Sequence, residues 1–287
     1  MRVIIPTKRM KNKSFNLIKL FVCSLALFLI TLFSNIDSIS GQTKSADWGY
    51  TSDAGPLHWG ELSSDFTTCK VGENQSPIDI GENSRFNMKK VARADVDPLQ
   101  FDYKDSRLKI INNGHTIEVD YTKGSSLRIG DELYELRQFH FHSPSEHTID
   151  GRAYPMVAHL VHKSENGKIA VVGVFMKMGK KNDFLQALWE NLPVDKREKT
   201  IDSVSLNAVD LLPSDHSYYH YVGSLTTPPC SEGVNWFVLE NPIEVSPEQI
   251  AKFISFYSWN SRPTQPLHKR IVEEEIDLSV EVSGNSC

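Results

Sequence analysis

The stretch of the chain that decides the fold is QFHFHSPSEH, residues 138–147. Phe139, His140, Phe141 and His142 alternate an aromatic ring with an imidazole. Side chains of a β-strand point to opposite faces in turn, so this alternation predicts a strand that carries both imidazoles on one face. The stretch therefore supplies half of a candidate metal site.

A second strand-like run, VAHLVH at residues 157–162, carries His159. If the two runs are neighbours in a sheet, His159 can lie beside His140 and His142. Three histidines with one open position are the ligand set of a catalytic zinc, because a structural zinc closes its shell with four protein ligands. The alternative, that these are hydrogen-bonded core histidines, fits this pattern about equally well.

The composition is that of a globular protein, with 40% hydrophobic and 23% charged residues in a chain of 287. This length fits one large domain or two small ones. Residues 1–40 contain six of the 31 Lys and Arg and one of the 36 Asp and Glu, so residues 41–287 carry 25 basic against 35 acidic side chains, a net charge of −10. Such an acidic balance argues against a nucleic acid as partner.

The first 40 residues have the pattern of a secretory signal peptide. The basic head is followed by an apolar run at residues 20–33, which is shorter than the roughly twenty residues of a membrane span. Ser38 and Ser40 then provide small residues for cleavage near Ser40 and Gly41. We expect residues 41–287 to form the mature domain, periplasmic or secreted, without stable membrane insertion. An uncleaved anchor is the alternative, and lipoprotein processing at Cys23 is a second one.

Strand-like runs separated by turn signals such as Asn113-Gly114 and Asn166-Gly167 follow one another from about residue 91. The predicted strands are residues 99–103, 108–112, 116–121, 126–129, 132–142, 154–163, 169–178 and 234–239. Helical patterns are confined to residues 183–191 and 247–259. Residues 47–70 predict an irregular arm held down by aromatic side chains. The chain is therefore expected to be mostly β, mainly antiparallel, with short peripheral helices.

Several short motifs, spread from about Trp48 to Leu267, resemble the α-class carbonic anhydrases. They are FHFHSPSE at residues 139–146, AHLVH at 158–162, GSLTTPPC at 223–230, NGH at 113–115, QSPID at 75–79, and RP followed by QPL at 262–267. The resemblance is closest to the secreted bacterial branch. It implies a single domain with a large twisted central sheet and a metal at the foot of a conical cleft.

The resemblance also implies a reaction, the reversible hydration of carbon dioxide to bicarbonate and a proton by a zinc-bound hydroxide. Neutral imidazoles suit this chemistry, because they leave Zn²⁺ enough Lewis acidity to bring the pKa of a bound water from 15.7 to about 7. His140, His142 and His159 would hold the Zn²⁺. Thr226 and Glu146 would orient the hydroxide, and His115 would carry the proton away. On the residues alone, an exposed turn histidine without a catalytic task is slightly favoured for His115.

Further residues match positions that surround the family's metal. The implied substrate wall and bicarbonate side are Val161, Val171, Leu225, Thr226, Thr227, Val234 and Trp236. The implied water-ordering positions are Tyr50, Asn113 and Tyr221. Gln138 is expected to support His140, and a backbone carbonyl near Asn260 to support His142.

One residue departs from the family pattern at the expected metal site. The family usually has a glutamate two residues before the histidine that matches His159, and this chain has Val157 there. A valine cannot accept the imidazole proton. We expect faster zinc loss and an altered pKa of the zinc-bound water, with the reaction retained.

The family's secreted members imply a disulfide between Cys69 and Cys230, which export would permit. If Cys23 leaves with the signal peptide, Cys287 remains unpaired, free or linking two chains. Monomer and homodimer both remain open.

Two other functions compete with carbon dioxide hydration. One is a catalytically silent relative that binds a partner, which the presence of all three histidines argues against. The other is ester hydrolysis by the same hydroxide, which we expect only as a side activity because the pocket is narrow and apolar. The residues do not exclude cobalt or iron as the native metal.

Overall fold

The computed structural model describes residues 47–81 and 87–276. The expected signal peptide, its cleavage site and Cys287 lie outside these residues, so the boundary at residue 40 stays a prediction. Within the described ranges, no helix is both long and apolar enough to cross a membrane.

Strands dominate the described chain. In chain order they are β1 (Asp79–Ile80), β2 (Met88–Ala92), β3 (Gln100–Asp102), β4 (Ser106–Asn112), β5 (Ile117–Asp120), β6 (Ser126–Ile129), β7 (Glu132–His142), β8 (Thr148–Ile149), β9 (Arg152–Ala153), β10 (Met156–Ser164), β11 (Ile169–Met178), β12 (Glu198–Leu206), β13 (Tyr218–Ser224), β14 (Glu232–Val245) and β15 (Val272–Ile276). Twelve of them form one sheet, and β1, β8 and β9 form a small second one.

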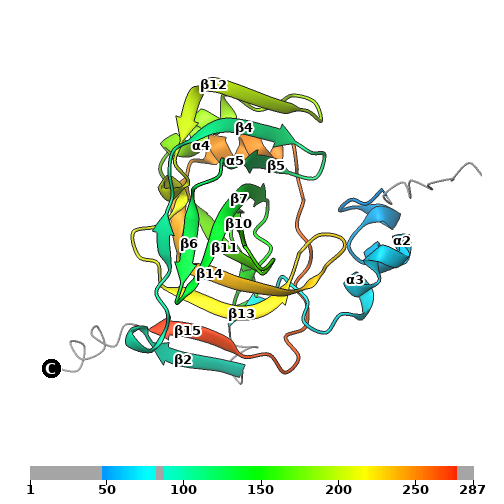
Figure 1. Ribbon diagram of the computed structural model, residues 1–287. Coiled ribbons are helices and arrows are strands. Elements are labelled where there is room, and N and C mark those ends of the chain that lie inside the picture. The colour runs from blue at the N-terminus through cyan, green and yellow to red at the C-terminus, as the bar shows by residue number, and fades with distance from the viewer. Residues whose placement is uncertain (1–46, 82–86, 277–287) are drawn as a thin grey trace, which may run out of the picture. The chain divides into compact units, whose positions relative to one another are not determined.

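The large sheet runs in the order β12-β4-β5-β7-β10-β11-β14-β13-β15-β2 (Figure 1), and β6 also pairs with β7 while β3 pairs with β6. The pairings β11–β14 and β15–β2 are parallel, and the others are antiparallel. The mainly antiparallel, mostly β prediction is thus confirmed, although the sheet is mixed. The long connection between β11 and β14 permits their parallel pairing, since parallel neighbours cannot be joined by a tight hairpin.

The two predicted helices are present but shorter than expected. Helix α4 spans Asp183–Trp189, and helix α5 spans Pro247–Ile254. The Asn182 side chain accepts a hydrogen bond from the first turn of α4, and Ser246 forms a capping box with Gln249 at the start of α5. These side chains satisfy backbone N–H groups that have no partner within the helix, so both helices begin where the sequence predicts.

The alternation in β7 sorts its side chains onto opposite faces. Phe139 and Phe141 are fully buried and contact aromatic rings of the two helices, with centroid distances of 5.8 Å to Phe184 of α4 and 6.2 Å to Phe253 of α5. His140 and His142 point to the other face, as strand geometry requires. The core thereby fixes the direction in which the imidazoles project.

The sequence did not predict strands β1, β2, β8 and β9, and it also did not predict β12, β13 and β15. The last three have the sequences EKTIDSVSL, YYHYVGS and VEEEI. Most side chains of β12 are exposed, and β15 carries three adjacent glutamates, so neither strand shows a clear alternation of apolar and polar residues. Their strand conformation depends on pairing with a neighbour, which a local pattern cannot reveal.

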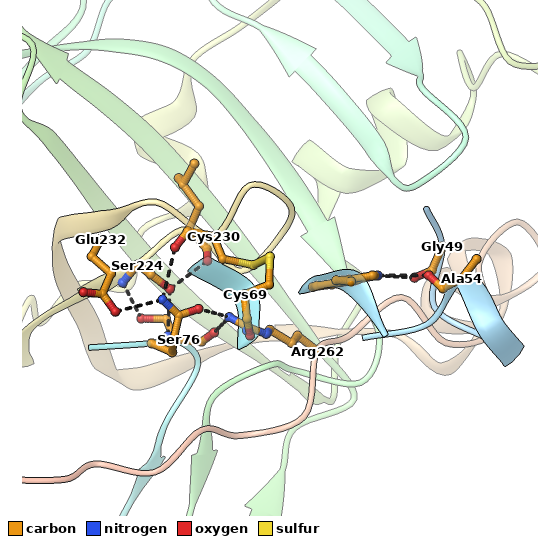
Figure 2. Close-up of a disulfide and its surroundings, with 11 residues drawn as sticks. Gly49, Ala54, Cys69, Ser76, Ser224, Cys230, Glu232 and Arg262 are labelled. Carbon is orange, nitrogen blue, oxygen red and sulfur yellow. Dashed lines mark hydrogen bonds between the residues drawn. A yellow bond between two sulfur atoms is a disulfide. The ribbon is translucent and has the colours of Figure 1, made fainter. Parts of the chain in front are cut away.

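The arm before β1 is irregular apart from single turns of helix, among them α2 (Trp59–Leu62) and α3 (Thr68–Val71). The fully buried Trp59 donates its indole N–H to the carbonyls of Gly49, at 2.8 Å, and Ala54, at 3.0 Å (Figure 2). A disulfide joins Cys69 to Cys230, as the family resemblance implied. The indole hydrogen bonds hold the arm together internally, and the disulfide fastens the arm to the segment between β13 and β14.

Arg262 forms a second attachment beside the disulfide. Its guanidinium donates to the Gln75 side chain at 2.9 Å and to the carbonyls of Ser76, at 2.8 Å, and Cys69, at 3.0 Å (Figure 2). The side chain is 2% exposed, and burial lowers its pKa to about 10. The guanidinium remains charged at neutral pH, so these hydrogen bonds are charge-assisted and stronger than neutral ones.

Candidate active site

Three imidazoles meet where β7 and β10 pair. The antiparallel register sets His159 directly opposite His140 and sets Val157 opposite His142. One ring nitrogen from each of His140, His142 and His159 lies within 4.8 Å of the others. The sequence placed these histidines on two strands, and the structure makes the strands neighbours in the register that brings the rings together.

Burial favours the neutral form of His140 and His159. His142 and His159 are each 1% exposed. Loss of hydration holds the pKa of His140 and of His159 well below the ordinary value of 6.5, and the neighbouring His142 lowers both further. A neutral imidazole has a free lone pair, which is the form that binds a metal ion.

The two histidines of β7 each have a hydrogen-bond partner that fixes the ring. The Gln138 side-chain oxygen lies 2.8 Å from His140 Nδ1, and the Asn260 carbonyl oxygen lies 2.6 Å from His142 Nδ1. A carbonyl only accepts, so His142 Nδ1 donates and its Nε2 keeps a lone pair. That Nε2 atom is buried and forms no hydrogen bond with any of the described residues.

The residues present fit a divalent metal. His142 Nε2 and His159 Nδ1 lie 3.5 and 3.8 Å from the same carboxylate atom, Glu146 Oε2. This oxygen also lacks a well-formed hydrogen bond within the described chain. Imidazole nitrogens that converge beside a buried, unsatisfied carboxylate oxygen are costly unless a cation or other donor joins them. A three-nitrogen donor set with one free corner is the arrangement that Zn²⁺ adopts in catalytic sites.

Comparison with known proteins agrees with this geometry. The family model described as eukaryotic-type carbonic anhydrase matches residues 54–276. The chain belongs to the α-class carbonic anhydrase family. A carbonic anhydrase of a Nostoc species is 44% identical over 247 residues, covering 86% of this chain and 92% of the relative. A carbonic anhydrase of Pectobacterium carotovorum is 42% identical, covering 87% and 97%.

The fold agrees as well. The solved structure of an α-carbonic anhydrase from Thermovibrio ammonificans, in complex with the inhibitor sulfanilamide, superimposes with a TM-score of 0.75 at 43% identity, covering 79% of this chain and 99% of that one. The protein is therefore a carbonic anhydrase. Enzymes of this family hydrate carbon dioxide and use zinc.

In this carbonic anhydrase, Glu146 is 2% exposed and tied to the chain after α5. Its Oε1 accepts the Arg262 backbone N–H at 2.9 Å. Burial raises the pKa of the carboxyl, while His142, the Arg262 N–H and the nearby Thr226 side chain act in the opposite direction. Arg262 thus connects the arm to Glu146, through its guanidinium on one side and its backbone N–H on the other. The motif at residues 262–267 does not by itself predict this connection.

The predicted wall residues gather in one apolar cluster. Val171, Val234 and Trp236 are each 2% exposed within it, and the partly buried Val161 and Leu225 pack against it. Thr226 is 5% exposed, and Thr227 is partly buried after it. Trp236 lies 4.9 Å from His159, centroid to centroid, so this cluster borders the imidazoles.

His115 lies at the turn between β4 and β5 and is partly exposed. Its ring stacks on Trp48, with centroids 3.8 Å apart and planes at 7°. Burial and the positive Lys196 lower the pKa of His115, and Asp47 partly opposes them. This stacking brings Trp48 of the arm against a predicted site residue, a contact that the sequence does not predict.

The residues expected to order waters lie in different surroundings. The Asn113 side-chain oxygen accepts the backbone N–H groups of His115 and Thr116, both at 2.9 Å, and so holds the turn. Burial raises the pKa of Tyr50, and the negative charge of Glu146 raises it further. Tyr221 is 1% exposed, and its hydroxyl contacts Ser76 and His147, so its partners are protein side chains.

Proposed function

We propose that this protein catalyses the reversible hydration of carbon dioxide to bicarbonate and a proton, with Zn²⁺ held by His140, His142 and His159. The observation that carries the proposal is that one ring nitrogen from each of three imidazoles on two adjacent strands converges within 4.8 Å, with His142 and His159 buried and His140 half-buried. When bound, the metal supplies Lewis acidity that makes a hydroxide available near neutral pH.

Thr226 and Glu146 are proposed to orient the nucleophile. Glu146 is fixed by the Arg262 N–H and has its second oxygen free to accept from the Thr226 hydroxyl. A hydroxyl that donates to a carboxylate has its oxygen left to accept one hydrogen bond. Thr226 would then accept from the attacking group and fix its direction, which favours attack through orientation.

The apolar cluster beside the imidazoles suits carbon dioxide, which is small and uncharged. Val161, Val171, Leu225, Val234 and Trp236 provide apolar contact, and the Thr226 backbone N–H and Thr227 would contact the oxygens of substrate and product. Polar groups are few there, so a charged product is held weakly and can leave. Ester hydrolysis at the same site is proposed only as a side activity.

His115 is proposed to transfer the released proton to buffer. Its partly exposed position at a turn lets it exchange protons with solvent, and its pKa below the ordinary value means that it releases a proton readily near neutral pH. Tyr50 and Asn113 flank this path in our proposal. Tyr221 is proposed to hold His147 in place, because its hydroxyl contacts both Ser76 and His147.

We further propose that the mature enzyme is periplasmic or secreted. The Cys69–Cys230 disulfide supports this location, because disulfides persist in oxidising compartments. The cleavage near Ser40 and Gly41 remains part of the same proposal.

Stopped-flow measurement of carbon dioxide hydration, with zinc content determined on the same sample, tests the function. The expected result is one zinc per chain and a hydration rate that a chelator removes and added Zn²⁺ restores. A protein that binds partners or esters but does not hydrate carbon dioxide when fully loaded would contradict the proposal.

A further inference from the structure

Two buried ring nitrogens close to the metal site have no partner among the described residues. They are His147 Nδ1 and His159 Nε2. His147 is 0% exposed and His159 is 1% exposed. The other nitrogen of each ring is engaged, because His147 Nε2 lies 2.6 Å from the Tyr221 hydroxyl and His159 Nδ1 faces the imidazole cluster. Buried polar atoms of this kind are rare in folded proteins.

The two rings are neighbours. Their centroids are 6.2 Å apart, and both pack on the same indole, that of Trp236, at 4.7 Å from His147 and 4.9 Å from His159. Val157 belongs to the apolar cluster around that indole and lies two residues before His159 on the same face of β10. A valine has no atom that can bond to either nitrogen.

The corresponding position on β7 holds a hydrogen-bonding side chain. Gln138 lies two residues before His140, and its oxygen contacts His140 Nδ1. Val157 stands in the same relation to His159, on the neighbouring strand. On β10, His159 therefore lacks the hydrogen-bond acceptor that Gln138 provides to His140 on β7.

The protonation states of the two nitrogens are complementary. A neutral imidazole carries one proton, so His159 bears its proton on Nε2 when Nδ1 binds a metal. His147 Nδ1 is an acceptor when Nε2–H donates to the Tyr221 oxygen. The Tyr221 hydroxyl can then donate to Ser76 Oγ, 2.8 Å away. One group that both accepts and donates would satisfy the two rings.

We propose that a single buried water joins His159 Nε2–H to His147 Nδ1, and that His147 is thereby a positioning residue for the metal ligand His159. The inference rests on the proposed role of His159 as a ligand. Two hydrogen bonds of about 2.9 Å meeting at one water bridge nitrogens that are too far apart for direct contact. Water is suited to this role, because buried waters are held by two to four polar partners.

The test measures zinc release from the loaded protein into excess chelator. His147→Phe removes the bridge and keeps a ring of similar size. The expected result is release about tenfold faster or more, since outer partners of metal-binding histidines typically change metal affinity 10- to 100-fold.

His162→Phe is the matched control. Like His147, His162 is fully buried and contacts a tyrosine hydroxyl, that of Tyr103, at 2.7 Å. It lies on β10, the strand that carries His159. It is expected to lose folding stability without changing zinc release. Equal release from parent and His147→Phe, or equal acceleration in both variants, would overturn the inference.

A double-mutant cycle separates positioning from general loosening. Val157→Gln gives β10 the same pair that Gln138 and His140 form on β7, and it is expected to slow zinc release about tenfold. In that background His147→Phe is expected to have little effect, because the amide oxygen accepts from His159 directly. Val157→Glu is the second variant if the glutamine variant does not fold. Additive effects would contradict a shared water.

The proposed function and this inference fail differently. A parent protein without stoichiometric zinc would remove the proposed function. A parent that holds one zinc and releases it independently of His147 would remove only the bridge.

Discussion

Strands β7 and β10 supply the same kind of side chain to one site but hold it differently. On β7, His140 and His142 each have a partner for the ring nitrogen that faces away from the cluster. On β10, His159 has none among the described residues. The difference lies in the residue two positions before the histidine on the same face of the strand. This residue is Gln138 before His140 on β7 and Val157 before His159 on β10.

This comparison separates two properties of a metal site. The inward nitrogens and the strand register determine whether a metal can bind at all. The outward nitrogens determine how rigidly each ring is held, and so how easily the metal leaves. A chain can keep the first property while losing part of the second, and we predict this for Val157.

The largest effect is expected from removing one inward nitrogen. His142→Ala should abolish stoichiometric zinc and lower hydration at least about 1000-fold, because no hydroxide is then available at neutral pH. Zinc content and stopped-flow hydration measure this. His58→Ala, at an exposed position of the arm, is the control and should retain both. A zinc-loaded, active His142 variant would mean that two imidazoles suffice and that the strands contribute unequally.

Removing the partner on β7 should make that strand resemble β10. Gln138→Leu deletes the acceptor beside His140 Nδ1, and zinc affinity should fall about 10- to 100-fold. Competition with a chelator of known affinity measures the change. Gln138→Glu retains an acceptor and should hold zinc at least as firmly as the parent. Unchanged affinity in the leucine variant would show that ring support on β7 is unimportant.

His115 lies outside the comparison and should separate holding the metal from moving the proton. His115→Ala is expected to keep one zinc but to lower turnover at least about tenfold in dilute buffer, with recovery in concentrated imidazole buffer. Stopped-flow rates over a series of buffer concentrations test this. Turnover equal to the parent at the lowest buffer concentration would exclude His115 as the proton carrier.

The smallest effect concerns another buried atom without a hydrogen bond, Glu240 Oε1. Here the surroundings are acidic. Burial first, and then Glu274, Asp215 and Glu275, raise the Glu240 pKa from 4.5 to about 7, with Arg93 opposing them. Between these two values the folded protein keeps a proton that the unfolded chain has lost, so stability falls as the pH rises.

Glu240→Gln should therefore be more stable than the parent at pH 8, by on the order of 1 kcal/mol after allowance for solvent screening. The gain should vanish below about pH 4.5, where the carboxyl is protonated in both states. Denaturant unfolding across this pH range tests it, with the exposed Glu165→Gln as control. A gain that is the same at pH 4 and pH 8 would point to packing instead of charge.

Much of the fold could be predicted because its central strands carry their pattern locally. The alternation in residues 138–142 and the apolar run of β11 need no partner to be recognised, and the helices α4 and α5 begin with capping residues. Strands β12 and β15 have no clear alternation of apolar and polar residues, and they gain their conformation from pairing with neighbouring strands. The exposed side chains of β12 and the glutamates of β15 belong to strands that no local rule distinguishes from loops.

The site divides in the same way. The cluster of three histidines, the Gln138 and Asn260 partners and the missing acceptor at Val157 could be inferred from the sequence and the family resemblance. The stacking of His115 on Trp48, the link from Arg262 to Glu146 and the position of His147 beside His159 could not, because each joins residues from separate parts of the chain.

The sequence by itself determined which side chains are available: imidazoles on two strands, a carboxylate after the first strand, and a valine where an acceptor was expected. Only the tertiary structure decided which of their atoms meet and which are left without a partner. The physical reason is that alternation along a strand is a local property of the backbone, whereas the satisfaction of a buried nitrogen depends on what the rest of the fold places next to it.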